Sequence, residues 1–300
     1  MHTVADDVKL AIFDDYQLGL VSLDGSHIVD VTPLLRRQHD ADPLGAGWWV
    51  RLCRDFPRIE SALTSAAIAG ESRPIGEVRL KAPALNPGKI VAAAANYTAH
   101  RDEMRAVTQR VGGTSPGWMG EFDVFLKAPS SIVGPQDEIL LPKEAVAAQK
   151  EIHHESELAV VIGTGGTRIS EGDALKHVLG YTIGLDMTVR GEGDRSRRKS
   201  YDTFTPLGPW MVTAEEVGDP QALEIGLTVN GQPRQNVHTS TMLTPVAKLV
   251  SYASRVMRLD PGDVILTGAP PGVGPVQDGD VIETWITRIG RMTLRVRNDA

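Results

Sequence analysis

The chain has 300 residues, enough for one large domain or for a small domain joined to a larger one. Its 41% apolar and 23% charged residues are typical of a soluble globular protein, and its net charge of −7 argues against nucleic acid or an anionic membrane as a partner. The start lacks the features of a signal peptide, and no apolar run reaches transmembrane length. The single cysteine, Cys53, excludes an internal disulfide and a cysteine-based zinc site. We therefore expect a cytoplasmic protein.

The N-terminal part predicts a small unit of its own. Residues 9–32 hold two alternating apolar runs around Asp24-Gly25, a pair that favours a β-hairpin. A mostly helical stretch is expected from residue 33 to residue 68. Residues 72–88, with three prolines and two glycines, are typical of a joint between units. We therefore predict a small α/β domain over residues 1–78 and a larger domain over residues 79–300.

The larger part predicts short strands separated by turns, with few helices. The clearest helix covers residues 244–263, with Thr244 as its cap and Pro245 at its first position. A short helix is expected within residues 169–180, where Ser170 and Asp173 match a capping box. The absence of a strand–helix–strand rhythm favours a β-rich α+β fold over a doubly wound sheet. Strands are predicted at residues 89–97, 122–129 and 177–186, and a hairpin at residues 223–236 around Asn230-Gly231.

Three acidic residues are candidates for a metal site. Glu155 and Glu157 stand two positions apart in "HHESELAVVIG", so a strand there points both side chains the same way. Asp186 ends a later apolar strand in a similar setting. Three carboxylates without cysteine suit a hard cation such as Mg²⁺ or Mn²⁺. Acidic pairs are also common on solvated strand faces, so the spacing alone leaves both interpretations open.

A histidine and a glutamate form a second candidate group. His100 and Glu103, in "NYTAHRDEM", lie three positions apart and share one face of a helix. A carboxylate beside an imidazole orients it and raises its basicity, as a general base that activates water requires. The alternative is a surface histidine with an incidental acidic neighbour. The glycine-rich residues 111–121 that follow are typical of a mobile lid loop.

Two further segments have weaker patterns. Residues 190–204 mix charges, and most of their arginines are expected in a solvated loop. Residues 267–274, "TGAPPGVG", lack the Lys-Ser/Thr of a phosphate loop, although their backbone amides can face an anion. No Gly-x-Ser-x-Gly motif occurs, which argues against a serine hydrolase.

Six segments together resemble the fumarylacetoacetate hydrolase superfamily in order and spacing, from about residue 89 to the C-terminus. The resemblance implies a catalytic domain with a mixed β-roll, preceded by the smaller N-terminal domain that many members have, and usually a homodimer. Each segment alone is weak, and the set is specific. The segments are "NYTAHRDEM", "FLKAPSSIVGPQDEILLP", "HHESELAVVIG", "GYTIGLDMTVR", "KSYDTFTPLGPW" and "LDPGDVILTGAPPGVGPVQDGD".

The resemblance also implies roles for particular residues. The family's metal ligands match Glu155, Glu157 and Asp186, and its lid pair matches His100 and Glu103. Its active-site lysine, which is catalytic and contacts substrate, matches Lys199, and a substrate-binding threonine matches Thr267. The chain departs from the family at Ala269, where many relatives have threonine, and at His154, where an acidic residue is commoner. Both departures are expected to affect substrate fit.

The activity that the resemblance implies is hydrolysis of a carbon–carbon bond in an acylpyruvate, such as fumarylpyruvate or maleylpyruvate. The products are pyruvate and a carboxylic acid, formed with Mg²⁺ or Mn²⁺ during the breakdown of aromatic compounds. Decarboxylation or isomerisation of a 2-oxo diacid, such as oxaloacetate or a homocatechuate-pathway intermediate, is the alternative. A module that binds a 2-oxo acid without turnover is a third. The acyl group is expected to be selected by residues 105–121 and 232–243.

Overall fold

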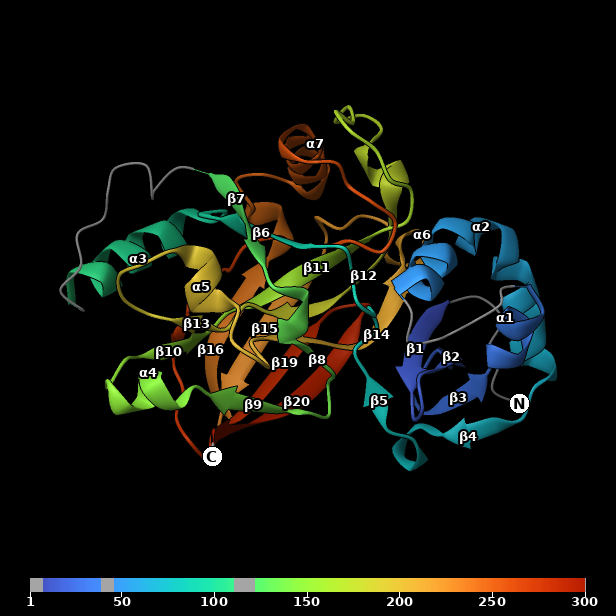
Figure 1. The fold of residues 1–300 in the computed structure, drawn as a ribbon, viewed down its shortest axis with the longest axis horizontal. Helices are drawn as coiled ribbons and strands as arrows, with labels where there is room; N and C mark the ends of the chain where they lie inside the picture. Colours follow the sequence, from blue (N-terminus) through green and yellow to red (C-terminus); the bar gives the residue numbers. More distant parts are fainter. Residues whose placement is uncertain (1–7, 39–45, 111–121, 300) are drawn as a thin grey trace.

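The computed structural model describes residues 8–38, 46–110 and 122–299, and its main feature is a large, mostly antiparallel sheet (Figure 1). The strands of this sheet are β1 (Lys9–Phe13), β2 (Gln17–Val21), β3 (His27–Asp30), β4 (Ser72–Pro74), β5 (Leu80–Lys81), β6 (Ile90–Ala94), β7 (Asp123–Lys127), β8 (Ile132–Val133), β11 (Ser156–Ile162), β12 (Val178–Leu185), β14 (Thr205–Thr213) and β17 (Val264–Leu266). Their order is β4-β3-β2-β1-β14-β12-β11-β17-β6-β7, with β5 beside β1 and β8 beside β14.

Two smaller sheets complete the β structure of the described residues. One has the order β16-β15-β19-β20-β9 and the other the order β13-β10-β18. The β-rich α+β class predicted from the sequence is confirmed. The strands of the two sheets are β9 (Glu138–Leu141), β10 (Ile152–His154), β13 (Thr188–Val189), β15 (Glu224–Val229), β16 (Gln232–His238), β18 (Gly274–Pro275), β19 (Val281–Ile286) and β20 (Gly290–Asn298).

The helices lie around these sheets, with α3 and α5 at the opposite end of the molecule from α1 and α2 (Figure 1). No helix among the described residues is long and apolar enough to span a membrane. The α-helices are α1 (Thr32–Gln38), α2 (Ala46–Ala69), α3 (Thr98–Arg110), α4 (Lys143–Ala147), α5 (Arg195–Lys199), α6 (Ala214–Val217) and α7 (Val246–Val256), and the 3₁₀ helices are η1 (Ile75–Glu77), η3 (Pro129–Ser131), η4 (Ala174–His177) and η5 (Thr239–Thr241).

Both predicted hairpins are present. Asp24 and Gly25 lie between β2 and β3, and Asn230-Gly231 joins β15 to β16. Asn230 and Gly231 have φ of 51° and 73°, the left-handed values that a two-residue type I′ turn requires. The expected helical stretch is present as α1 and α2, with residues 39–45 between them outside the described part.

Two expectations about helices are wrong in detail. The short helix expected within residues 169–180 is only the four-residue 3₁₀ helix η4, Ala174–His177, because β12 begins directly after it, at Val178. Ser170 still accepts the amide of Asp173, which closes the turn before η4. Thr244 does not cap α7, because the helix begins at Val246 and its N-cap residue is Pro245. The backbone amide and carbonyl of Thr244 are both bound to Asn96.

The main sheet is buried on both faces. Leu158, Val160 and Ile162 of β11 pack in one core with α7, while the alternate residues Ala159 and Val161 pack in a second core with α2. The N-terminal strands continue the same sheet, because β1 pairs with β14. The division into residues 1–78 and 79–300 stays a proposal, and the two parts share a sheet and a core.

One buried asparagine fixes the region where β6, β17 and α7 meet. Asn96 follows Ala95, whose φ of 58° turns the chain sharply after β6. The Asn96 side chain donates to the carbonyls of Thr244 (3.0 Å) and Thr267 (2.7 Å) and accepts the amide of Thr244 (2.6 Å). These bonds bring the start of α3 and the segment that begins at Thr267 to one place in the fold.

Replacing Asn96 by alanine is expected to lower the free energy of unfolding by about 3 kcal/mol or more. The substitution leaves three buried backbone groups without partners, and each such group costs about 1–3 kcal/mol. Urea denaturation measures the loss. The exposed Asn298→Ala is the control, with an expected change within about 0.5 kcal/mol. Equal midpoints for Asn96→Ala and wild type would show that these bonds contribute nothing.

Candidate active site

The three acidic residues lie together and are almost fully buried. Glu155 occupies the break between β10 and β11, Glu157 lies in β11, and Asp186 directly follows β12. The Asp186 amide donates to the Glu155 carbonyl (2.8 Å), which holds the two acids side by side. One oxygen from each of the three carboxylates lies within 4.8 Å of the others, and the residues are only 1–3% exposed. The solvated-face interpretation is therefore wrong.

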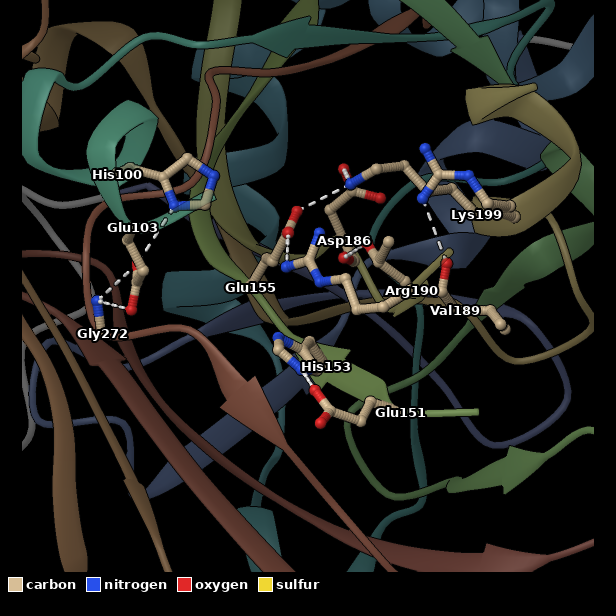
Figure 2. A network of polar contacts seen from close by, with 12 residues as sticks. His100, Glu103, Glu151, His153, Glu155, Asp186, Val189, Arg190, Lys199 and Gly272 are labelled. Atoms are coloured by element: carbon tan, nitrogen blue, oxygen red, sulfur yellow. Dashed lines mark hydrogen bonds and ion pairs between the residues drawn. The ribbon is translucent and has the colours of Figure 1, made fainter. Parts of the chain in front are cut away.

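Basic side chains surround two of these acids (Figure 2). Lys199 of α5 contacts Glu155 (2.7 Å) and Asp186 (2.5 Å), Arg190 pairs with the other oxygen of Glu155, and Lys127 of β7 binds Asp186 (2.7 Å). Burial alone would raise the pKa of Glu155, but the charges of Lys199 and Arg190 outweigh it and hold that pKa well below its usual range. Glu155 is therefore ionised.

Glu157 is in a different electrostatic position. Its Oε2 accepts the Gly268 amide (2.6 Å), and its Oε1 is buried with no hydrogen-bond partner among the described residues. Burial, followed by the charges of Asp186 and Glu155, raises the pKa of Glu157 well above its ordinary value. A divalent cation would provide the missing partner and would offset the repulsion. The three hard oxygen donors therefore fit Mg²⁺ or Mn²⁺.

His100 and Glu103 lie on α3 with their side chains adjacent. His100 Nδ1 is 3.4 Å from Glu103 Oε2, and the Gly272 amide donates to both oxygens of Glu103 (3.2 and 3.3 Å). The charge of His100 is one of those that lower the pKa of Glu155, so the imidazole lies near the acidic cluster. The structure brings the two candidate groups together, while their catalytic role stays a prediction. The lid predicted at residues 111–121 lies outside the described residues.

The glycine-rich segment lies between these two groups. The Thr267 hydroxyl donates to the Leu158 carbonyl (2.9 Å), and the next amide, that of Gly268, binds Glu157. Gly268 and Gly272 both have positive φ, and a Cβ on Gly272 would lie 1.9 Å from the Arg234 carbonyl oxygen, so only glycine fits. The anions that these amides face are thus carboxylates of the protein itself.

The two departures from the family pattern are both buried. Ala269 follows Gly268 directly, next to the amide that holds Glu157. His154 lies in β10 opposite Gly274, and burial lowers its pKa to about 4, so that its ring is neutral at neutral pH. Their proposed effect on substrate fit stays a prediction.

Several basic residues of the site are not predicted by the sequence patterns. No pattern singles out Lys127 or Arg190, and most arginines of residues 190–204 are expected in a solvated loop. That expectation is wrong, since Arg190 is buried, Arg195 and Arg198 are partly buried, and of the four only Arg197 is exposed. The spacing of these residues could have predicted their burial, because positions 195, 198 and 199 share one face of a helical turn.

Comparison with known proteins identifies the family. The family model described as fumarylacetoacetate (FAA) hydrolase C-terminal matches residues 89–297. A maleylpyruvate hydrolase of Aquipseudomonas alcaligenes is 39% identical over 296 residues, which cover 97% of this chain and 100% of the relative. A mitochondrial oxaloacetate tautomerase of Xenopus laevis is 35% identical, over 92% of this chain and 85% of the relative. The chain therefore belongs to the fumarylacetoacetate hydrolase family, as its motifs predicted.

A solved structure supports the same assignment. The crystal structure of maleylpyruvate hydrolase from Sphingobium sp. SYK-6, in complex with manganese(II) and pyruvate, superposes with a TM-score of 0.83 at 38% identity. The match covers 97% of this chain and 100% of that chain, so it includes the N-terminal strands as well as the residues that the family model matches.

Replacing Glu157 by glutamine is expected to raise the melting temperature of the metal-free protein by roughly 2 °C or more. The raised pKa of Glu157 means that folding must either bury a charge beside Asp186 and Glu155 or take up a proton, and a neutral amide avoids both costs. The same change should abolish most of the stabilisation by added Mg²⁺, since an anionic ligand is lost. Thermal unfolding with and without Mg²⁺ measures both effects. Exposed Glu171→Gln should change neither. A large fall in the metal-free melting temperature of Glu157→Gln would contradict this account.

Proposed function

We propose that this protein is a divalent-metal-dependent hydrolase that cleaves a carbon–carbon bond of an acylpyruvate, such as maleylpyruvate or fumarylpyruvate. The products are pyruvate and a carboxylic acid, and the reaction serves the breakdown of aromatic compounds. The observation that carries the proposal is the buried cluster of three acids with the His100–Glu103 pair nearby. The two maleylpyruvate hydrolases that match almost the whole chain support it.

In this proposal Glu155, Glu157 and Asp186 hold Mg²⁺ or Mn²⁺, which, when bound, supplies Lewis acidity toward the oxygens of a 2-oxo acid. Lys199 places a positive charge at the edge of the cluster, where it already contacts two of the acids. That charge stabilises the negative charge that develops on the pyruvate fragment as the carbon–carbon bond breaks. Thr267, beside the amide that holds Glu157, contributes to substrate binding.

His100 is proposed as the base that activates water. Glu103 orients the imidazole through Nδ1, and the Gly272 amide fixes Glu103 in turn. His100 removes a proton from water as the oxygen adds to the carbonyl farther from the carboxylate. Collapse of that adduct breaks the bond to the pyruvate fragment and forms the carboxylic acid. The pyruvate fragment then takes up a proton, so the sum is the addition of one water.

The main alternative is decarboxylation or isomerisation of a 2-oxo diacid. The relatives named oxaloacetate tautomerases support this alternative. Such a reaction needs no attack by water, so the two hypotheses differ in how strongly the activity depends on a base that activates water. A module that binds a 2-oxo acid without turnover is the remaining alternative.

Location and assembly belong to the same proposal. We infer a cytoplasmic enzyme that acts on a small molecule and has neither nucleic acid nor a membrane as a partner, in line with the acidic net charge of −7. The homodimer implied by the family resemblance stays a prediction. The last strand in the order of the main sheet, β7, has an exposed Leu126, and such an edge is one place where a second copy can pair.

The protein is expected to release pyruvate from maleylpyruvate only with Mg²⁺ or Mn²⁺ present. A chelator should abolish the activity and added metal should restore it, because the acids alone provide no electrophile. A coupled pyruvate assay measures the rate, with oxaloacetate tested in parallel. Turnover of oxaloacetate alone would favour the main alternative, and binding of either compound without turnover would favour the binding module.

His100→Ala and Glu103→Ala are each expected to reduce maleylpyruvate hydrolysis by roughly 10²- to 10⁴-fold, the usual contribution of a general base. Metal affinity, measured by calorimetry, should not change, because neither residue is a proposed ligand. The matched control is Asp102→Ala on the same helix, whose exposed side chain pairs with Arg105. Hydrolysis within a few-fold of wild type in both variants would exclude this pair as the base.

A further inference from the structure

Helix α5 carries more positive charge than the acidic cluster uses. Three cations, Lys127, Lys199 and Arg190, form ion pairs with Glu155 and Asp186, and they equal the three acids of the cluster in number, although Glu157 is in none of these pairs. Arg198 lies on the same short helix as Lys199 and is additional to this balance. A bound divalent cation makes the surplus larger. The site as a whole is therefore built to receive an anion with more than one negative charge.

Arg198 is held in place without a negatively charged partner. Its Nε donates to the Gly193 carbonyl (3.2 Å) and its Nη1 donates to the Val189 carbonyl (3.1 Å), and both acceptors are neutral. Among the described residues, no carboxylate forms an ion pair with Arg198. The guanidinium is thus oriented by the backbone while its charge stays uncompensated.

The surroundings of Arg198 make this charge unfavourable in the free protein. Its side chain is partly buried, and burial together with repulsion from Arg190 and Arg195 lowers its pKa. Two acids, Glu155 and Asp186, act on Arg198 in the opposite direction, but both are already in ion pairs with Lys199. A guanidinium fixed in this way is well suited to bind a carboxylate, because its planar group matches the two carboxylate oxygens.

The helix gives Arg198 a fixed place relative to the reacting centre. Arg198 directly precedes Lys199, whose ammonium contacts both Glu155 and Asp186. The helix begins at the Asp194 cap, which accepts the amide of Arg197 (3.3 Å), and it packs against β7 and β13. One side chain of α5 thus reaches the acids while its neighbour presents a second positive charge on the same side of the fold.

We propose that Arg198 binds the distal carboxylate of the substrate, so that the enzyme selects acylpyruvates whose acyl chain ends in a carboxylate. The inference rests on the proposed function for its substrate head group and adds the second charge that the substrate must have. Acylpyruvates with a neutral acyl chain, such as acetylpyruvate, are then poor substrates.

The first test compares turnover of maleylpyruvate and acetylpyruvate by wild type, Arg198→Gln and Arg197→Gln, all with Mg²⁺. Arg198→Gln should lower kcat/KM for maleylpyruvate by about 10- to 100-fold, the usual range for a charged hydrogen bond, and leave acetylpyruvate within about three-fold. Arg198→Lys, which keeps the charge, should recover part of the loss. Arg197, exposed on the same helix and involved in the cap only through its backbone, is the matched control and should not change either value.

The second test needs no turnover. Calorimetry with the Mg²⁺-loaded enzyme compares 2-oxoheptanedioate with 2-oxoheptanoate, which share a chain and a head group and differ only in the distal carboxylate. Wild type should bind the diacid about 10- to 100-fold more tightly, and Arg198→Gln should reduce that preference to about three-fold or less.

The two tests separate the inference from the function on which it rests. Equal losses on both substrates in Arg198→Gln, or no preference for the diacid in wild type, overturn the inference and leave the hydrolase proposal standing. A diacid preference that depends on Arg198, in a protein that cleaves neither acylpyruvate, supports the carboxylate site and overturns the hydrolase.

Discussion

Repulsion among three buried carboxylates is the constraint on which the rest of this structure depends. Glu155, Glu157 and Asp186 are held within contact distance by the backbone bond between Asp186 and Glu155 and by the pairing of β11 with β12. Water cannot screen them, so other charges must. Lys199, Arg190 and Lys127 neutralise two of the acids and leave Glu157 with an unpartnered oxygen. That asymmetry turns a buried acidic cluster into a site for a cation.

The elements around the acids are arranged to hold this strained group in one geometry. Asn96 ties the end of β6 to the start of α7 and to Thr267, and the amides of Gly268 and Gly272 bind Glu157 and Glu103. Both amides depend on glycine backbone with positive φ. The same short segment therefore fixes one proposed metal ligand and one member of the proposed base pair, which sets the relation between the two.

The charges also suggest how one family scaffold is adapted to a particular substrate. The acids and Lys199 match the motifs by which the family is recognised, and relatives of this chain are named as hydrolases, isomerases and tautomerases. In our proposal the acids and Lys199 serve the 2-oxo acid head of the substrate. Arg198 of α5 lies outside the six motifs. In our proposal Arg198, and not the metal ligands, determines which acyl chains are accepted.

The sequence by itself determined the features that depend on neighbours in the chain. The hairpin at Asn230-Gly231 follows from backbone preferences of two residues, and the shared direction of Glu155 and Glu157 follows from the period of a strand. His100 and Glu103 meet because they are three apart on α3. The six motifs, read together, were enough to identify the family.

Tertiary structure alone decided the features that depend on residues far apart in the chain. Lys127 meets Asp186, and Asn96 binds the backbone of Thr244, across separations that no local pattern encodes. The arginines of residues 190–204 resemble a solvated loop in sequence, and only the packing of α5 against β7 and β13 brings Arg198 close to the acids. The physical reason is burial. A charge that is removed from water must be stabilised by the charged and polar groups around it, and the tertiary structure determines which groups those are.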